Sequence, residues 1–128
     1  MRERRWFLGL QRSVDVQELS REIESILSLV DDISRQLLYF KTSLFNGSLE
    51  DTLSSLAKHL DNIGRIGITD AYIYAEKARL LLRYVRAYRM RAEQLHTLRR
   101  LSDVRDDVAS HIADIRAFVN RLKIYFIG

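Results

Sequence analysis

Arginine is the residue type in this sequence with the clearest chemical use, and it is concentrated in one stretch. Residues 77–100 carry eight basic residues and a single acidic one, Glu93. A helix turns by about 100° per residue, so Arg79, Arg83 and Arg86 would fall within about 60° of one another. Guanidinium groups keep their charge and bind phosphate oxygens through paired hydrogen bonds. Such a stripe would neutralise a phosphate backbone without reading the bases. The predicted nucleic-acid contacts on this helix are Arg79, Arg83, Arg86, Arg89 and Arg91.

A second basic cluster lies at the N-terminus. Residues 1–12 carry four arginines and one glutamate, and Trp6 and Phe7 follow the first three arginines. An arm of this composition can wrap around a nucleic acid, lie on an anionic membrane surface or dock on a neighbouring subunit. Because so short an arm is a weak membrane anchor, we expect nucleic-acid contact and not a membrane. The predicted contacts in the arm are Arg2, Arg4 and Arg5.

Carboxylates elsewhere in the chain offer these arginines an alternative partner. Residues 13–76 carry eleven acidic and five basic residues. Pairing with acidic residues of the first predicted helix, or of another subunit, would make the arginine stripe a structural feature. Within the arginine-rich helix only Glu76 and Glu93 lie near the stripe, so we expect an excess of positive charge there. The candidate acidic partners are Glu18, Glu22, Asp31 and Asp32.

The remaining polar residues do not form a catalytic or metal-binding pattern. The chain has no cysteine, and its three histidines, His59, His96 and His111, are far apart in the sequence. The sequence contains no glycine-rich phosphate loop and no nucleophile elbow. His111 falls in an apolar stripe, where we expect a hydrogen-bonded core histidine. We therefore predict no metal, no cofactor and no enzymatic activity.

Two short segments nevertheless resemble an enzyme family. Arg91 to His96 and Arg105 to His111 resemble the Arg-x4–6-His signature of HEPN ribonucleases, and Asp106 follows the second arginine as it does in that family. The resemblance covers seven residues. HEPN proteins are all-helical, carry this motif on a late helix and cut RNA as dimers. The resemblance implies, as an alternative function, RNA cleavage at a dimer interface.

The helices that must position these residues follow from the apolar pattern. In four segments the apolar residues recur at alternating spacings of four and three. This alternation places each set on one side of a helix and favours left-handed, nearly antiparallel packing. The four apolar stripes run from Leu19 to Leu44, from Leu49 to Ile63, from Tyr74 to Leu95 and from Leu101 to Tyr125.

Glycines and capping residues predict where these helices end. Gly47 ends the first helix because it can take a left-handed conformation, and Ser48 is placed to cap the second. Residues 64–67, which include two glycines, end the second helix. Ser102 can cap the fourth, but no glycine or proline separates it from the third, so one kinked helix is the alternative there.

We expect an all-α fold, an antiparallel four-helix bundle with heptad-type packing and unequal helices of about 30, 14, 30 and 25 residues. The domains are an N-terminal basic arm over residues 1–12 and a single helical bundle over residues 13–128. The fourth helix carries a second apolar stripe, which predicts burial on two sides and hence an oligomer. The predicted oligomer interface consists of Ile112, Val119, Tyr125 and Phe126.

The termini and the hydropathy give an expectation for location. No apolar stretch approaches the ~20 residues that a membrane-spanning helix needs. At the N-terminus the apolar run after the basic residues is too short for a signal peptide and lacks a cleavage site. We expect neither a transmembrane nor a secreted protein, but one that lies inside the cell or in a virion.

These observations favour a structural protein that oligomerises and coats DNA or RNA without sequence preference. In general character the chain resembles the coat (nucleocapsid) proteins of filamentous archaeal viruses, which are small, basic, cysteine-free and helical, with an N-terminal arm or helix facing DNA. The alternatives are a protein–protein adaptor or complex subunit, whose basic stripe binds an acidic partner, and the HEPN-type ribonuclease. The resemblance to coat proteins depends on Arg2–Phe7, Arg79–Arg91 and the apolar end Leu122–Ile127.

Coating through phosphate contacts predicts a strong salt dependence of binding. If four to six basic residues each neutralise one phosphate, log K falls against log salt with a slope of roughly −4 to −5. Titration of a labelled oligonucleotide at several salt concentrations measures this slope. A flat dependence, or no binding at low salt, would contradict the coating function.

Overall fold

The computed structural model describes residues 14–95 and 101–128. The predicted arm contacts Arg2, Arg4 and Arg5 lie outside the described residues. Helices account for most of the described residues, with no strand among them, so the all-helical prediction is confirmed. The helices are α1 (Val16–Leu38), α2 (Phe40–Asn46), α3 (Ser48–Ile66), α4 (Ala71–Leu95) and α5 (Leu101–Phe126).

Helix α1 begins where its sequence supplies a cap. The Asp15 carboxylate accepts hydrogen bonds from the backbone N–H groups of Gln17 and Glu18, at 3.1 Å each. These bonds satisfy two donors that have no partner within the helix. Beyond this first turn the predicted apolar stripe faces the core. Its fully buried members are Leu19, Ile23, Ile26, Val30 and Ile33.

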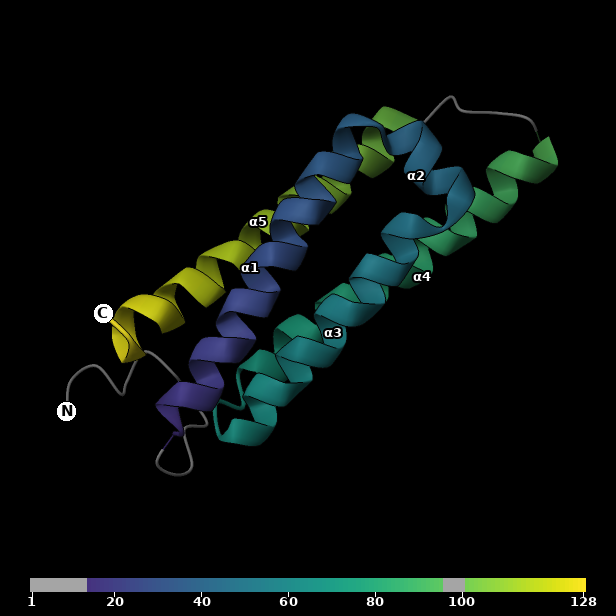
Figure 1. Cartoon of the computed structure of the whole chain (residues 1–128). Helices are drawn as coiled ribbons and strands as arrows, with labels where there is room; N and C mark the ends of the chain where they lie inside the picture. The colour runs from purple at the N-terminus through teal and green to yellow at the C-terminus, as the bar shows by residue number, and fades with distance from the viewer. Residues whose placement is uncertain (1–13, 96–100) are drawn as a thin grey trace.

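The predicted first helix is interrupted at Tyr39, so the prediction of one helix over this stretch is wrong. Tyr39 leaves the helical conformation, with φ −119° and ψ 42°, and the next seven residues form α2. Helix α2 connects α1 to α3 at one end of the molecule (Figure 1). The change of axis buries Phe40 and Leu44 and leaves Leu38 and Tyr39 exposed.

Glycines end α2 and α3, as the sequence predicts. Gly47 has a left-handed conformation with φ 77°, and Gly67 has φ 132°, a region that other residues rarely adopt. The cap of α3 differs from the prediction, because Ser48 is already the first helical residue. Asn46 Oδ1 accepts the Ser48 N–H at 2.9 Å instead.

Successive long helices run in opposite directions (Figure 1). Between α4 and α5, Lys77 Nζ lies 3.3 Å from Asp114 Oδ2, and the Tyr84 hydroxyl donates to Asp107 Oδ2 at 3.2 Å. As the residue number on α4 rises, the number of its contact residue on α5 therefore falls. These are two antiparallel helices and not one kinked helix. Helix α5 already includes Ser102, which is therefore not its cap.

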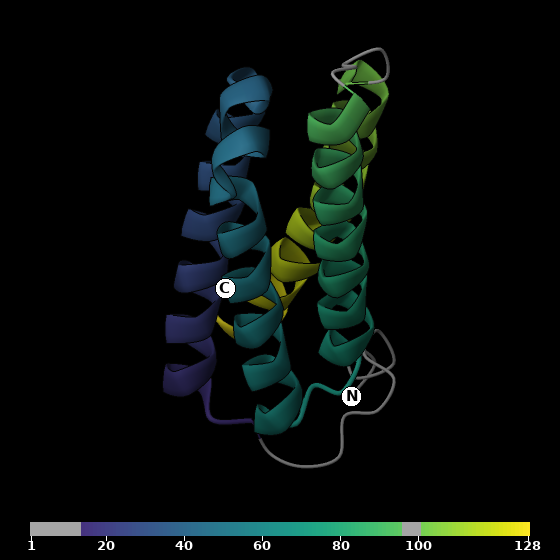
Figure 2. The same ribbon diagram turned by 90° about the vertical axis from the view of Figure 1, so that its right-hand side faces the viewer.

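The helices pack unevenly around the core. Helix α3 lies along both α1 and α4, and α5 lies along α1, whereas α4 and α5 pack more loosely against each other (Figure 2). Helix α4 buries three small residues, Ala71, Ala75 and Ala78, which let it lie close to its main neighbour, α3. As a result, α4 keeps an outer face that is only partly covered by α5.

The second apolar stripe of α5 is part of the core, which corrects the predicted oligomer interface. Ile112 and Val119 are 3% and 0% exposed, so they cannot contact a second copy. Tyr125 and Phe126 are half-buried against the core and pack edge to face at 4.5 Å. Among the described helices, including α5, none has both the length and the apolar character that crossing a membrane requires.

The contact between Gly64 and Tyr72 yields a test of the α3–α4 junction. A Cβ atom at Gly64 would lie 2.6 Å from the Tyr72 ring. Gly64→Ala should lower the free energy of unfolding by about 1–2 kcal/mol, because overpacking outweighs the roughly 1 kcal/mol gain in helix propensity. In a Tyr72→Ala background the same substitution should stabilise by about 1 kcal/mol. Urea denaturation measures both effects, and the same sign in the two backgrounds would contradict this steric account.

Candidate functional site

The arginines of the predicted arginine stripe on α4 contact carboxylates of the same chain. Arg79 forms ion pairs with Asp61 on α3 and with Glu76 on its own helix, the latter at 3.4 Å. Arg83 also contacts Glu76, at 3.2 Å. The expected excess of unpaired charge is therefore absent from this part of the stripe.

Glu50 on α3 binds two further arginines of the stripe. Its side chain is only 8% exposed. Arg89 Nε lies 2.5 Å from one carboxylate oxygen, and Arg86 Nε lies 3.3 Å from the other. Two cations around a buried carboxylate offset the cost of removing its charge from water. This cluster therefore ties α3 to α4.

The predicted acidic partners on α1 bind other residues. Glu22 lies 2.8 Å from His59 Nδ1, Asp31 lies 3.0 Å from Arg116 on α5, and Asp32 lies 3.7 Å from Arg35. The arginine stripe does pair within the chain, but its partners come from α3 and α4. The remaining predicted contact, Arg91, is exposed.

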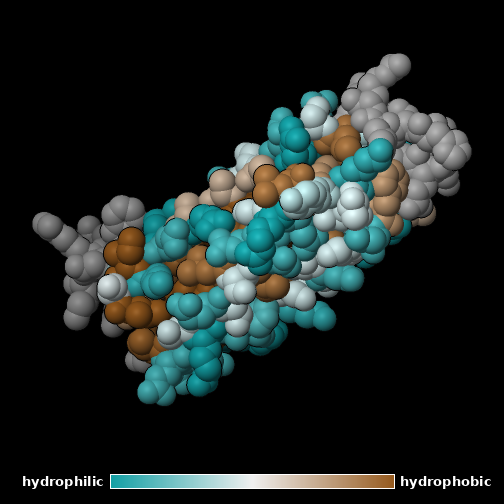
Figure 3. Space-filling view, turned by 45° about the horizontal axis from the view of Figure 1, so that its top comes forward, coloured by the Kyte–Doolittle hydropathy of each residue, from teal (hydrophilic) through white to brown (hydrophobic). Residues whose placement is uncertain are grey.

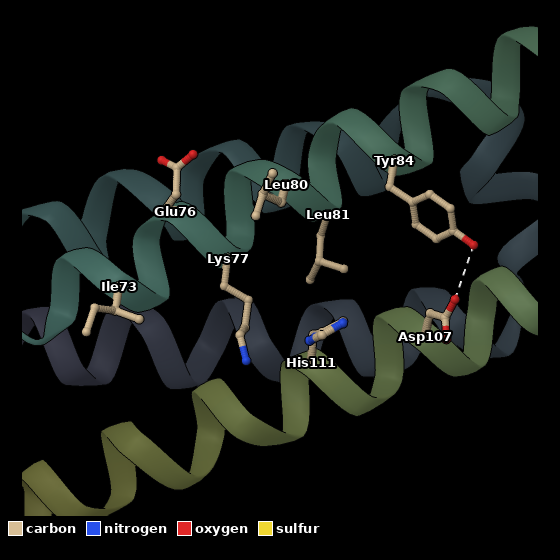
Figure 4. A pocket seen from close by; sticks show the side chains of 8 residues that line it. All are labelled: Ile73, Glu76, Lys77, Leu80, Leu81, Tyr84, Asp107 and His111. Atoms are coloured by element: carbon tan, nitrogen blue, oxygen red, sulfur yellow. Dashed lines mark hydrogen bonds between the residues drawn. The ribbon is translucent and has the colours of Figure 1, made fainter.

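An open groove runs between α4 and α5 (Figure 4). Its volume is about 760 Å³, and Leu81 and His111 face each other across its centre. Helix α4 supplies most of the apolar lining, and α5 supplies two polar residues. The lining residues are Ile73, Glu76, Lys77, Leu80, Leu81, Tyr84, Asp107 and His111.

Two polar contacts bridge the groove, two helical turns apart. One is the ion pair between Lys77 and Asp114, and the other is the hydrogen bond from Tyr84 to Asp107. Desolvation, and next to it the hydrogen bond to Asp107, raises the pKa of Tyr84 above its usual value of 10.0. The Tyr84 hydroxyl therefore remains a donor at neutral pH. The bridges fix the separation of the two helices, and the groove lies between them.

His111 is not the hydrogen-bonded core histidine that its place in the apolar stripe predicts. The side chain is partly buried, and its Nδ1 atom is shielded from solvent with no hydrogen-bond partner among the described residues. A buried nitrogen without a partner costs about 1–3 kcal/mol. The wall of the groove thus contains an unsatisfied polar atom beside apolar side chains.

The outer edge of the groove is an exposed apolar stripe on α4. Ile73, Leu80 and Tyr84 are 65%, 56% and 40% exposed. With Lys77 between the first two, their spacing is four, three and four, the same alternation that fills the core of this chain. We call these three apolar residues the α4 stripe. On the face drawn in Figure 3, by comparison, hydrophobic residues gather near one end and otherwise surface in small spots among hydrophilic ones.

Sequence reasoning missed the α4 stripe although a signal for it exists. The stripe starts one residue before the seam that begins at Tyr74, so α4 carries two apolar alternations side by side. The second stripe of α5 was instead interpreted as the exposed one, and the oligomer interface was predicted there. Which of two neighbouring stripes is buried depends on how the helices are rotated, which a periodicity does not give.

The structure does not bring together the residues of the HEPN-type motif within the chain. His111 lines the α4–α5 groove, whereas Arg105 lines a separate pocket beside Leu37 and Phe40. His96, in the other instance of the motif, lies outside the described residues. No group of three or more histidine, aspartate or glutamate side chains in residues 14–95 and 101–128 is arranged to hold a metal ion.

The Glu50 cluster predicts a large difference between two otherwise equivalent substitutions. Glu50→Gln should lower the free energy of unfolding by about 2 kcal/mol, because it removes the buried negative charge that Arg86 and Arg89 contact between α3 and α4. Glu76→Gln removes a carboxylate that also has two arginine partners but is 55% exposed, so its effect should be within about 0.5 kcal/mol. Urea denaturation of both variants measures the difference, and equal effects would contradict a structural role for Glu50.

Comparisons with family models, with curated proteins and with solved structures found no match for this chain.

Proposed function

We propose that this protein is a protein-binding structural module, an adaptor or complex subunit that receives a helix on the α4 stripe. The observation that carries the proposal is the exposure of Ile73, Leu80 and Tyr84 in one line beside an open groove. Single apolar residues on a protein surface are ordinary, but an aligned set beside a groove is typical of an interaction site.

The spacing of the stripe favours a helix as the partner. Side chains that alternate by four and three form a continuous line along α4, and such a line packs best against a second helix that crosses at a small angle. An amphipathic helix laid in a hydrophobic groove is a common mode of recognition. In this proposal the four long helices form an antiparallel bundle that is open at its α4–α5 edge, and the partner helix covers that edge.

The polar residues of the groove are suited to orient the partner. Tyr84 and Lys77 are each held by a carboxylate of α5, so their positions are fixed before binding, which lowers the entropy lost on association. An apolar rim with a few fixed polar groups is the usual composition of a binding groove.

Nucleic-acid coating stays a prediction, and the described residues give it less support than protein binding. Arg79, Arg83, Arg86 and Arg89 each already contact a carboxylate, which neutralises part of the charge that they could offer to a phosphate. The three carboxylates that they contact also repel a phosphate backbone. The arm residues Arg2, Arg4 and Arg5 lie outside this argument, so coating would depend chiefly on them and on Arg91.

Purification from the cells that produce the protein tests the proposal. The tagged wild type should retain a discrete protein partner, and Leu80→Glu should lose it, because a carboxylate at the centre of the stripe would be buried without a counterion. The identified partner is then purified, and its Kd for the wild type and for Leu80→Glu is measured by calorimetry. We expect at least 100-fold weaker binding by the variant, consistent with hot-spot losses of about 3 kcal/mol.

The matched control is Ile124→Glu, which places the same charge at an apolar residue of α5 that is 73% exposed. This variant should bind like the wild type. A partner retained equally by both variants would show that the α4 stripe is not the binding surface. Retention of nucleic acid alone, insensitive to Leu80→Glu, would favour the coating function instead.

A further inference from the structure

Two charged residues beside the α4 stripe indicate what kind of helix can bind there. Glu76 and Arg83 lie on the same flank of the stripe, two turns apart, and their side chains are 55% and 63% exposed. Within the chain they contact each other at 3.2 Å along the surface of α4. Both groups therefore remain accessible from outside, with opposite charges at opposite ends of the stripe.

We propose that the partner of the α4 stripe is the α4 stripe of a second copy of this chain, packed antiparallel across a two-fold axis. This inference rests on the proposed function and names its partner. A two-fold axis that passes near Leu80 keeps each flank on its own side and reverses the order of residues along it. Glu76 of one copy then lies beside Arg83 of the other, and the same pair forms a second time, as an isologous interface requires.

The apolar residues of the stripe are self-complementary in the same arrangement. The two copies of Leu80 lie next to each other close to the axis, and Ile73 of one copy lies against Tyr84 of the other. The register that pairs the charges is, to within about a residue, the register that pairs the apolar side chains. A helix of unrelated sequence would have to supply both features separately.

The size of the stripe sets the expected strength of the dimer. Exposed fractions of 65%, 56% and 40%, on side chains of very roughly 150–250 Å² each, give on the order of 300 Å² of apolar surface per copy. Even with the charged flank added, the total stays below the roughly 1,200 Å² of standard specific interfaces and is typical of weak, transient ones. We therefore expect a reversible dimer with a dissociation constant in the micromolar range, not an obligate one.

Sedimentation velocity of the purified full-length chain, at roughly 1 to 300 μM, tests the self-association. The wild type and the control Ile124→Glu should both show a concentration-dependent monomer–dimer equilibrium. Leu80→Glu should remain a monomer throughout, with the helical circular dichroism of the wild type. A wild type that is monomeric over the whole range overturns the inference, and so does a dimer that Leu80→Glu leaves intact.

Charge-reversal variants test the pairing itself. Glu76→Arg carries two positive charges on the flank, and Arg83→Glu carries two negative ones, so each alone should dimerise at least 10-fold more weakly than the wild type. An equimolar mixture of the two variants should form a heterodimer, because their charges complement each other only between copies. A mixture that associates no better than the separate variants overturns the proposed pairing.

Cysteine crosslinking tests the orientation, which the absence of cysteine from the chain makes straightforward. A mixture of Ile73→Cys and Tyr84→Cys should form a mixed disulfide dimer under mild oxidation, whereas Ile73→Cys alone should not. Crosslinking of Ile73→Cys to itself would show parallel helices and overturn the antiparallel arrangement. If the pure chain is monomeric but another protein binds in a Leu80-dependent way, self-association fails and the docking function stands. If no association depends on Leu80, both fail.

Discussion

The ion pairs between α3 and α4 are the constraint on which the surface of this protein depends. Glu50 holds Arg86 and Arg89, and Asp61 holds Arg79, while small buried residues of α4 let the two helices lie close together. Helix α5 is attached to a different neighbour, since Arg116 and Lys123 pair with carboxylates of α1. Because α4 and α5 are held chiefly by different helices, they pack loosely against each other, which leaves the groove between them.

The helices themselves were predictable from the sequence because burial depends on spacing. One residue per turn at alternating spacings of four and three marks the side of each helix that reaches the core, and Gly47 and Gly67 mark two of the ends by their backbone conformation. The break at Tyr39 was not predictable in this way. No glycine or proline lies there, and the helix ends because the chain must turn to bury the residues that follow.

The candidate site was not predictable, because it depends on the register and rotation of helices relative to one another. The charge of the arginine stripe can be counted along the sequence, but the position of Glu50 opposite it cannot. Glu50 lies in the first turn of a helix, where a solvated acidic residue is ordinary. The same limit explains the two apolar stripes. The periodicity of the sequence contains the second apolar stripe of α5 and the stripe on α4 alike. Only the packing shows that Ile112 and Val119 are buried while Ile73 and Leu80 are exposed.

The exposed apolar residues of the α4 stripe are not needed for the stability of the isolated chain. Lysine or glutamate at Ile73 and Leu80 would serve a solvent-exposed helix at least as well, since helix propensity differs little among these residue types. Leucine and isoleucine therefore add nothing to α4 as a free surface, and they add a risk of nonspecific aggregation. In the proposed complex the exposed stripe becomes favourable, because another helix covers this edge of the molecule.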